Sequence, residues 1–117
     1  MQTPSLRMNY EFSRVYKKGR FVAGRHLVVH YLRRPGHVTR IGITASRQVK
    51  NSVRRNHVKR LLRESYRPIE DQVREGYDII LVGRHTQSKQ DYHLMHGELI
   101  KLLNRARLMD RQKEPLP

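Results

Sequence analysis

The sequence predicts an α+β fold, a two-layer α/β sandwich in which a four-stranded sheet packs against helices. Short segments rich in β-branched residues follow one another between residues 20 and 45, and another lies at residues 77–82. Other segments instead repeat apolar residues at the three- and four-residue spacing of amphipathic helices. The predicted order is α-β-β-β-α-β-α, and 117 residues are enough for one domain with a single core.

The first helix is expected to be capped by Asn9 or Ser5, to run to about Lys18 and to end at Gly19. Its apolar positions are Phe12, Val15 and Tyr16. Core packing is the simpler role for the two aromatic rings, and the spacing leaves open their exposure to a partner.

Strands are predicted at residues 20–23, 26–32 and 40–45. Pro35 and Gly36 form a strong turn signal between the last two of them. Because a turn joins these two strands, we expect them to pair antiparallel.

Residues 47–67 predict a basic turn followed by an amphipathic helix. Asn51 or Ser52 is the expected N-cap, and Pro68 is expected to end or kink the helix at Arg67. The buried face is predicted to contain Val58, Leu61, Leu62 and Ile69. The other face carries Arg55, Lys59, Arg63 and Arg67, with Asn56 and Arg60 in the next row.

This ladder of cations opposes helix stability, because like charges at i, i+4 repel by about 0.2–0.5 kcal/mol per pair. Only Arg60 and Glu64 form an attractive i, i+4 pair within it. A row of phosphates would relieve the repulsion, whereas the simpler alternative is a solvated charged face.

The strand at residues 77–82 (YDIILV) contains a continuous apolar run, which is typical of a central, buried strand. A last helix is expected from Asp91 to about Met109. Its apolar stripe is predicted to contain Leu94, Leu99 or Ile100, Leu102, Leu103 and Ala106. Residues 110–117 are predicted to be a flexible tail of the single domain that spans residues 1–117.

Composition points to a polyanionic partner. The formal net charge is +15 and the pI is about 11.1, which favours nucleic acid over an anionic membrane. No apolar run approaches the length of a membrane-spanning helix, and the N-terminus lacks the apolar core of a signal peptide, so we expect a cytoplasmic location. The absence of cysteine excludes disulfides and thiolate chemistry.

No catalytic constellation is visible in the sequence. The acidic residues show no paired spacing, and neither a glycine-rich phosphate loop nor a nucleophile motif is present. His93 and His96 are spaced to chelate a metal, but they have no acidic or sulfur partner nearby, so no metal site is predicted. The chain therefore reads as a binding protein.

Structured RNA is the favoured partner. A DNA-reading helix usually belongs to a helix-turn-helix or a dimeric basic region, and neither is apparent here. A basic helix can instead grip the phosphates of folded RNA, and aromatic rings can stack on single-stranded bases. The candidate rings are Phe12, Tyr16, Phe21 and Tyr31. A DNA-binding nucleoid protein remains an alternative at this point.

Residues 40–67 resemble the signature of the bacterial ribonuclease P protein subunit. Ser46-Arg47-Gln48 stands at its basic turn, followed by Arg55-Asn56-His57, Lys59-Arg60, Arg63-Glu64 and Tyr66-Arg67 on the helix. The resemblance extends to Leu6-Arg7, Phe12, Val15-Tyr16, Gly19 and the strand at residues 78–82. His57 stands where the family usually has arginine, Gln48 where it has a lysine and Lys50 where glycine is common.

The resemblance implies a left-handed β-α-β crossover and a role as protein component of an endoribonuclease. That enzyme removes the 5′ leader of precursor tRNA, and its RNA subunit carries out the Mg²⁺-dependent chemistry, so no catalytic residue is expected in the protein. Mg²⁺ is expected to be held mainly by the RNA and the substrate. The alternative is a ribosomal or general structured-RNA-binding protein with no role in cleavage.

The implied partners are ribonuclease P RNA and precursor tRNA, bound by a monomer in a one-to-one complex with the RNA, with no membrane and no DNA. The residues expected to bind the RNA subunit are Arg47, Lys50, Arg54, Arg55, Asn56, His57, Lys59, Arg60, Arg63 and Arg67. The residues expected to bind the leader are Phe12, Tyr16, His30, Arg55, Asn56 and Lys59.

Overall fold

The computed structural model describes residues 2–86 and 90–110, so most of the predicted C-terminal tail lies outside the described residues. The elements are α1 (Asn9–Lys18), β1 (Arg20–Ala23), β2 (Leu27–Arg33), β3 (Arg40–Ala45), α2 (Ser52–Tyr66), η1 (Arg67–Gln72), β4 (Tyr77–Gly83) and α3 (Tyr92–Arg105). The predicted element order and the α+β class are confirmed.

Within the described residues, the four strands form one sheet in the order β1-β2-β4-β3. The expectation that β2 and β3 pair with each other is wrong, because β4 lies between them, antiparallel to β2 and parallel to β3. The physical reason is the burial of β4: Ile79, Ile80 and Leu81 are all 0% exposed, so this strand gains most by a central place with both faces covered. The predicted central position of β4 is confirmed.

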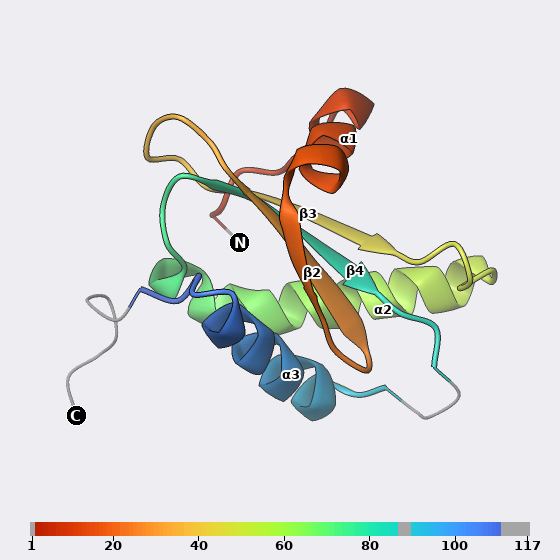
Figure 1. Ribbon diagram of the computed structural model, residues 1–117. Coiled ribbons are helices and arrows are strands. Elements are labelled where there is room, and N and C mark those ends of the chain that lie inside the picture. The colour runs from red at the N-terminus through yellow and green to blue at the C-terminus, as the bar shows by residue number, and fades with distance from the viewer. Residues whose placement is uncertain (1, 87–89, 111–117) are drawn as a thin grey trace, which may run out of the picture.

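Helices cover both faces of the sheet (Figure 1). The larger core lies between one face and α2 with α3, and contains the predicted α2 residues Val58, Leu61 and Leu62. On α3 the predicted stripe is wrong at Leu94, which is 47% exposed, because the neighbouring Met95 is fully buried instead. The crossover β3-α2-β4 joins parallel neighbours; its left-handed sense stays a prediction.

The boundaries of α1 and α2 follow from local chemistry. Asn51 caps α2 by accepting hydrogen bonds from the backbone N–H groups of Val53 and Arg54. The helix changes at Tyr66 into the 3₁₀ helix η1, which has Pro68 in its first turn. Neither Asn9 nor Ser5 caps α1: its N-cap is Met8. The Glu11 carboxylate instead reaches back to accept from the backbone N–H groups at the start of the helix.

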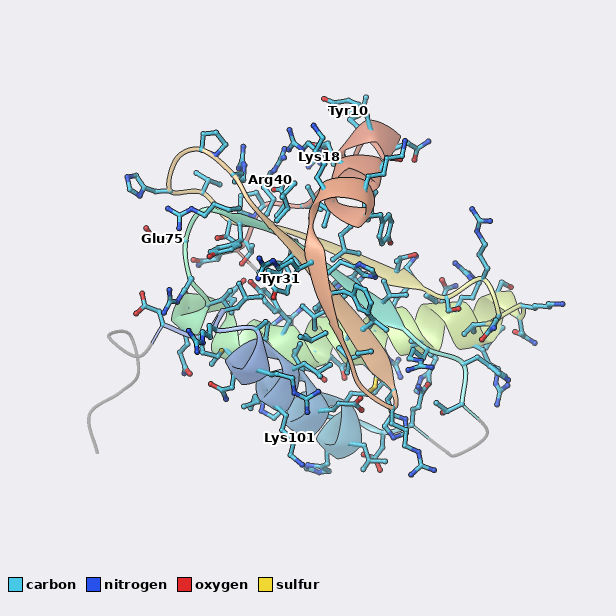
Figure 2. The ribbon with its side chains drawn as sticks, in the orientation of Figure 1. Tyr10, Lys18, Tyr31, Arg40, Glu75 and Lys101 are labelled. Atoms are coloured by element: carbon cyan, nitrogen blue, oxygen red, sulfur yellow. The ribbon has the colours of Figure 1, made fainter. Side chains whose placement is uncertain are left out.

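A buried ionic cluster attaches α1 to its face of the sheet. The Asp78 side chain on β4 is 0% exposed and accepts hydrogen bonds from Arg14 of α1 at 3.0 Å and from Arg40 of β3 at 2.8 Å. Arg40 also pairs with Glu11 of α1, and Arg34 lies 3.7 Å from Asp78. Figure 2 shows Arg40 near the base of α1. A second apolar cluster of Leu6, Val15 and Ile80 completes this attachment.

The Asp78 cluster keeps its carboxylate ionised. Burial would raise the pKa of Asp78, but the hydrogen bonds from Arg40 and Arg14 and the charges of Arg40 and Arg34 outweigh it, so the pKa lies below its usual value. The ionised carboxylate thus ties α1 to the end of the sheet where β3 and β4 begin.

Candidate nucleic-acid interface

The outer side of α2 and the turn before it form a basic surface. Most of the predicted cations there are exposed, whereas Lys59 is half-buried. We define the basic surface as Arg47, Lys50, Arg54, Lys59, Arg60, Arg63 and Arg67. Asn56 and His57 lie exposed among these cations.

Arg60 and Glu64 form the predicted i, i+4 ion pair at 3.8 Å, with both side chains largely exposed. Such a pair contributes little to stability and leaves most of the positive charge of the helix unneutralised.

Arg55 lies differently from the rest of the predicted ladder. Its guanidinium donates hydrogen bonds to the backbone carbonyls of Ser46 at 2.8 Å, Val49 at 3.0 Å and Ala45 at 3.1 Å. It therefore fixes the turn that connects β3 to α2, which carries the exposed Arg47 and Lys50. A guanidinium has five N–H donors, so two remain available to a ligand.

Three rings meet on the α1 side of the sheet, and we call Tyr16, Phe21 and His30 the aromatic surface. His30 of β2 lies between the other two, with ring centroids 4.8 Å from Tyr16 of α1 and 5.6 Å from Phe21 of β1. Tyr16 is 44% exposed and Phe21 is 63% exposed. Tyr31, another predicted candidate, packs against the larger core on the opposite face, because successive strand residues alternate sides.

The rings of the aromatic surface are uncharged at neutral pH. Burial lowers the pKa of His30 below its ordinary value and raises the pKa of Tyr16 above its ordinary value. The imidazole is thus neutral at pH 7, and both rings can stack on a base without bringing charge of their own.

Phe12 of α1 is half-buried, and its ring lies directly on Gly42 of β3. Beside it is a small hollow of about 160 Å³ lined by Ser5, Leu6, Phe12, Ile41, Gly42, Ile43 and Arg63. Arg63 comes from α2, on the other side of the sheet, so this hollow brings a cation of the basic surface next to an α1 ring at the outer edge of β3.

Among the predicted leader-binding residues, the structure brings Tyr16 and His30 into ring contact. Phe12, Tyr16 and His30 share the α1 side of the sheet, and Arg63 rather than Lys59 lies beside Phe12. Phe21 was absent from the predicted leader-binding set. Its alternation with Val22 in β1 and its cross-strand pairing with His30 are the signals that could have placed it there.

Chemically, this arrangement can hold phosphates on the basic surface and stack bases on the aromatic surface. Among the residues that the structure describes, no three His, Cys, Asp or Glu side chains converge to form a metal site. None of the helices within the described ranges is long and apolar enough to cross a membrane.

Comparisons with known proteins agree on one family. A family model described as Ribonuclease P matches residues 1–107. The Ribonuclease P protein component of Natranaerobius thermophilus is 37% identical over 110 residues, covering 94% of this chain and 96% of that protein. The protein of the same name from Alkaliphilus oremlandii is 39% identical over 105 residues, covering 90% and 92%.

Solved structures give the same result. The RNase P protein of Staphylococcus aureus superposes with a TM-score of 0.81 at 28% identity and covers 93% of this chain and 100% of that one. The RNase P protein of Thermotoga maritima superposes with a TM-score of 0.76 at 28% identity, covering 86% and 96%.

Proposed function

The chain belongs to the bacterial ribonuclease P protein family, and from this membership we propose that its aromatic surface receives the 5′ leader of precursor tRNA while its basic surface holds the catalytic RNA. As a member it is the protein component of the ribonucleoprotein that matures the 5′ end of tRNA, in which the RNA subunit carries out the cleavage.

The observation that carries this proposal is the cluster of Tyr16, Phe21 and His30. Tyr16 and Phe21 are 44% and 63% exposed and both contact His30, so the rings form one exposed patch, and contiguous exposed patches of this kind mark interaction sites. Base stacking on an aromatic side chain contributes about 1–3 kcal/mol per base and needs no particular sequence. This suits a leader whose sequence differs from one precursor tRNA to the next.

Phe12 extends the leader site towards the edge of β3. Asn56 and Lys59 of α2 are proposed to contact both RNAs. Arg55 is proposed to do the same through the two N–H donors that its bonds to the turn leave available. The residues proposed to bind the RNA subunit are Arg47, Lys50, Arg54, Arg55, Asn56, His57, Lys59, Arg60, Arg63 and Arg67.

We further propose that the chain acts as a single domain and a cytoplasmic monomer, one to one with the ribonuclease P RNA, with neither DNA nor a membrane as partner. The described residues offer no metal site of their own. Family membership supports assigning Mg²⁺ mainly to the RNA and the substrate.

The test is reconstitution of the protein with the ribonuclease P RNA of its own organism at low Mg²⁺. We expect faster correct 5′ cleavage than with RNA alone, and tighter binding of a leader-bearing precursor than of a leaderless one. Phe21→Ala, at an exposed ring, is expected to weaken only the leader-bearing substrate, by about 1–3 kcal/mol.

Equal affinity for leader-bearing and leaderless substrates would contradict the leader site and favour a general structured-RNA-binding role. Tighter binding to duplex DNA than to folded RNA at matched salt would contradict the RNA assignment altogether.

A further inference from the structure

The outer side of α1 carries a ring and cations that belong to neither the aromatic surface nor the basic surface. We call Tyr10, Arg14, Lys17 and Lys18 the outer stripe; all four are exposed. At about 100° of rotation per residue, their side chains fall within an arc of about 100°. Val15, which is buried against the sheet, lies about 140° from Tyr10 around the helix. The outer stripe therefore points away from the sheet.

Tyr10 is 68% exposed, more than either Tyr16 or Phe21 of the aromatic surface. Figure 2 shows it at the tip of α1, on the side away from the sheet. A ring with this much exposure contributes little to the core. Its face is instead available to stack on a nucleic-acid base.

The charge of the outer stripe is not neutralised from within α1. The one acidic residue of this helix, Glu11, is buried, accepts from backbone N–H groups and pairs with Arg40. Arg14 donates one hydrogen bond to Asp78 at 3.0 Å, which leaves other N–H donors of its guanidinium available. Because Lys17 and Lys18 follow Arg14 by three and four residues, these like charges repel one another weakly.

The helix dipole explains only part of this arrangement. Lysines in the last turn of a helix are favourable, which accounts for Lys17 and Lys18. It does not account for an exposed ring seven residues before Lys17, about 10 Å away along the helix axis. A ring beside cations is the combination with which proteins stack bases and hold phosphates.

We propose that the outer stripe binds the catalytic RNA subunit, with Lys17 and Lys18 on phosphates and Tyr10 stacked on an unpaired base. The inference deepens the proposed function and rests on its RNA partner. It adds a contact on the face of the sheet opposite to α2, so that the protein lies between two segments of the RNA (Figure 1).

The RNA subunit fits this surface better than the substrate does. The repulsion within the outer stripe is permanent, and the RNA subunit is the partner that stays bound through successive turnovers. The leader leaves at each turnover and is proposed to lie on the inner side of α1, against Tyr16 and His30.

The first test uses the absence of cysteine from the chain, because a single introduced cysteine then carries a photo-crosslinking group at one known place. Tyr10→Cys labelled with a benzophenone is expected to crosslink to ribonuclease P RNA in the protein–RNA complex without precursor tRNA. Lys101→Cys, at an exposed lysine on the outer side of α3, is the matched control and is expected to give a far lower yield.

The second test is the affinity of the whole protein for the RNA subunit across a salt series. Lys17→Gln and Lys18→Gln are each expected to reduce the magnitude of the slope by about one. Tyr10→Ala is expected to weaken binding about tenfold, whereas Tyr10→Phe keeps the ring and is expected to bind like the parent. Thermal unfolding should not change, and neither should the difference in affinity between leader-bearing and leaderless precursors.

The inference is overturned if Tyr10→Cys crosslinks no better than Lys101→Cys, or if its crosslinks appear only after precursor tRNA is added. Parental affinity of Tyr10→Ala for the RNA subunit would also overturn it, while leaving the proposed function in place. A parent protein that does not bind the RNA subunit at all would remove both.

Discussion

At the scale of single residues, Arg55 shows how one cation can serve the interface indirectly. Its three hydrogen bonds to the carbonyls of Ala45, Ser46 and Val49 shape the turn that carries Arg47 and Lys50. A lysine at this position would keep the charge but not the planar fork of donors.

Arg55→Lys is therefore expected to lower the free energy of unfolding by about 1–2 kcal/mol, since bonds from a charged donor are lost. Urea denaturation measures this. Lys59→Arg, the reverse exchange one turn along the helix, is the control and is expected to stay within about 0.5 kcal/mol of the parent. Identical stabilities for Arg55→Lys and the parent would show that the clasp contributes nothing.

Gly42 is the residue that lets Phe12 lie flat on the sheet. A Cβ at this position would stand 2.7 Å from Cε1 and 2.8 Å from Cζ of the Phe12 ring, so the ring would have to move. Gly97 on α3 has nothing within 4 Å of the same added atom. The two glycines thus offer a matched pair.

Gly42→Ala is expected to destabilise the protein by about 1–3 kcal/mol through overpacking. Gly97→Ala is expected to stabilise it by up to about 1 kcal/mol, because alanine is the better helix former. Thermal unfolding of both variants checks the opposite signs. A neutral Gly42→Ala would mean that Phe12 is loosely held.

At the scale of elements, the cation ladder of α2 shows which side-chain positions the residue spacing predicts correctly and which it does not. An i, i+4 step advances the side chain by 400°, so each rung moves 40° around the helix. Arg55 consequently starts beside the buried face and is half-buried, whereas Arg67, just past the end of α2, is exposed. Periodicity correctly predicted which ladder residues are exposed at the C-terminal end. It did not predict the contacts of Arg55, because the carbonyls that accept its hydrogen bonds belong to a turn whose shape the spacing does not encode.

The attachment of α1 also depends on contacts between distant segments. The end of α1 at Lys18 is predictable from the local sequence, because Gly19 follows it directly. The Asp78 cluster joins residues up to 64 positions apart, and nothing in the local pattern marks Asp78 as buried. The cluster determines where Phe12 and Tyr16 are held over the sheet.

Asp78→Asn is expected to lower the free energy of unfolding at pH 7 by about 2–3 kcal/mol. This is less than the 3–5 kcal/mol typical of fully buried pairs, because the partner arginines are partly exposed. The pKa of Asp78 is lower in the folded than in the unfolded chain, so its contribution is present above the unfolded value of 3.8 and is lost as pH falls through the folded value.

Denaturant titrations of Asp78→Asn and the parent at pH 7 and at decreasing pH below 3.8 test this. The difference between the two proteins should shrink as the pH falls. A difference that is independent of pH would assign the loss to packing rather than to charge.

At the scale of the whole molecule, the net charge of +15 and its placement on α2 govern affinity for RNA. If about four to six phosphates are neutralised, the logarithm of the affinity is expected to fall with the logarithm of salt concentration at a slope of about −3 to −5. Lys59→Ala and Arg60→Ala should each reduce the magnitude of the slope by about one.

Binding of the ribonuclease P RNA across a salt series measures these slopes. Lys101→Ala is the control, since this exposed lysine lies on the outer side of α3, away from the basic surface (Figure 2). A slope equally reduced by Lys101→Ala would mean that charge acts through the whole molecule rather than through contacts on α2.

The position of β4 between β2 and β3 has a consequence for synthesis on the ribosome. The first 76 residues emerge as α1, three strands, the basic α2 and η1, without the strand that both β2 and β3 need as a neighbour. Such long-range pairing delays folding until its last partner arrives. A nascent chain that has not reached Gly83 therefore has no completed sheet, and its cationic helix emerges from the exit tunnel before the domain that will carry it exists.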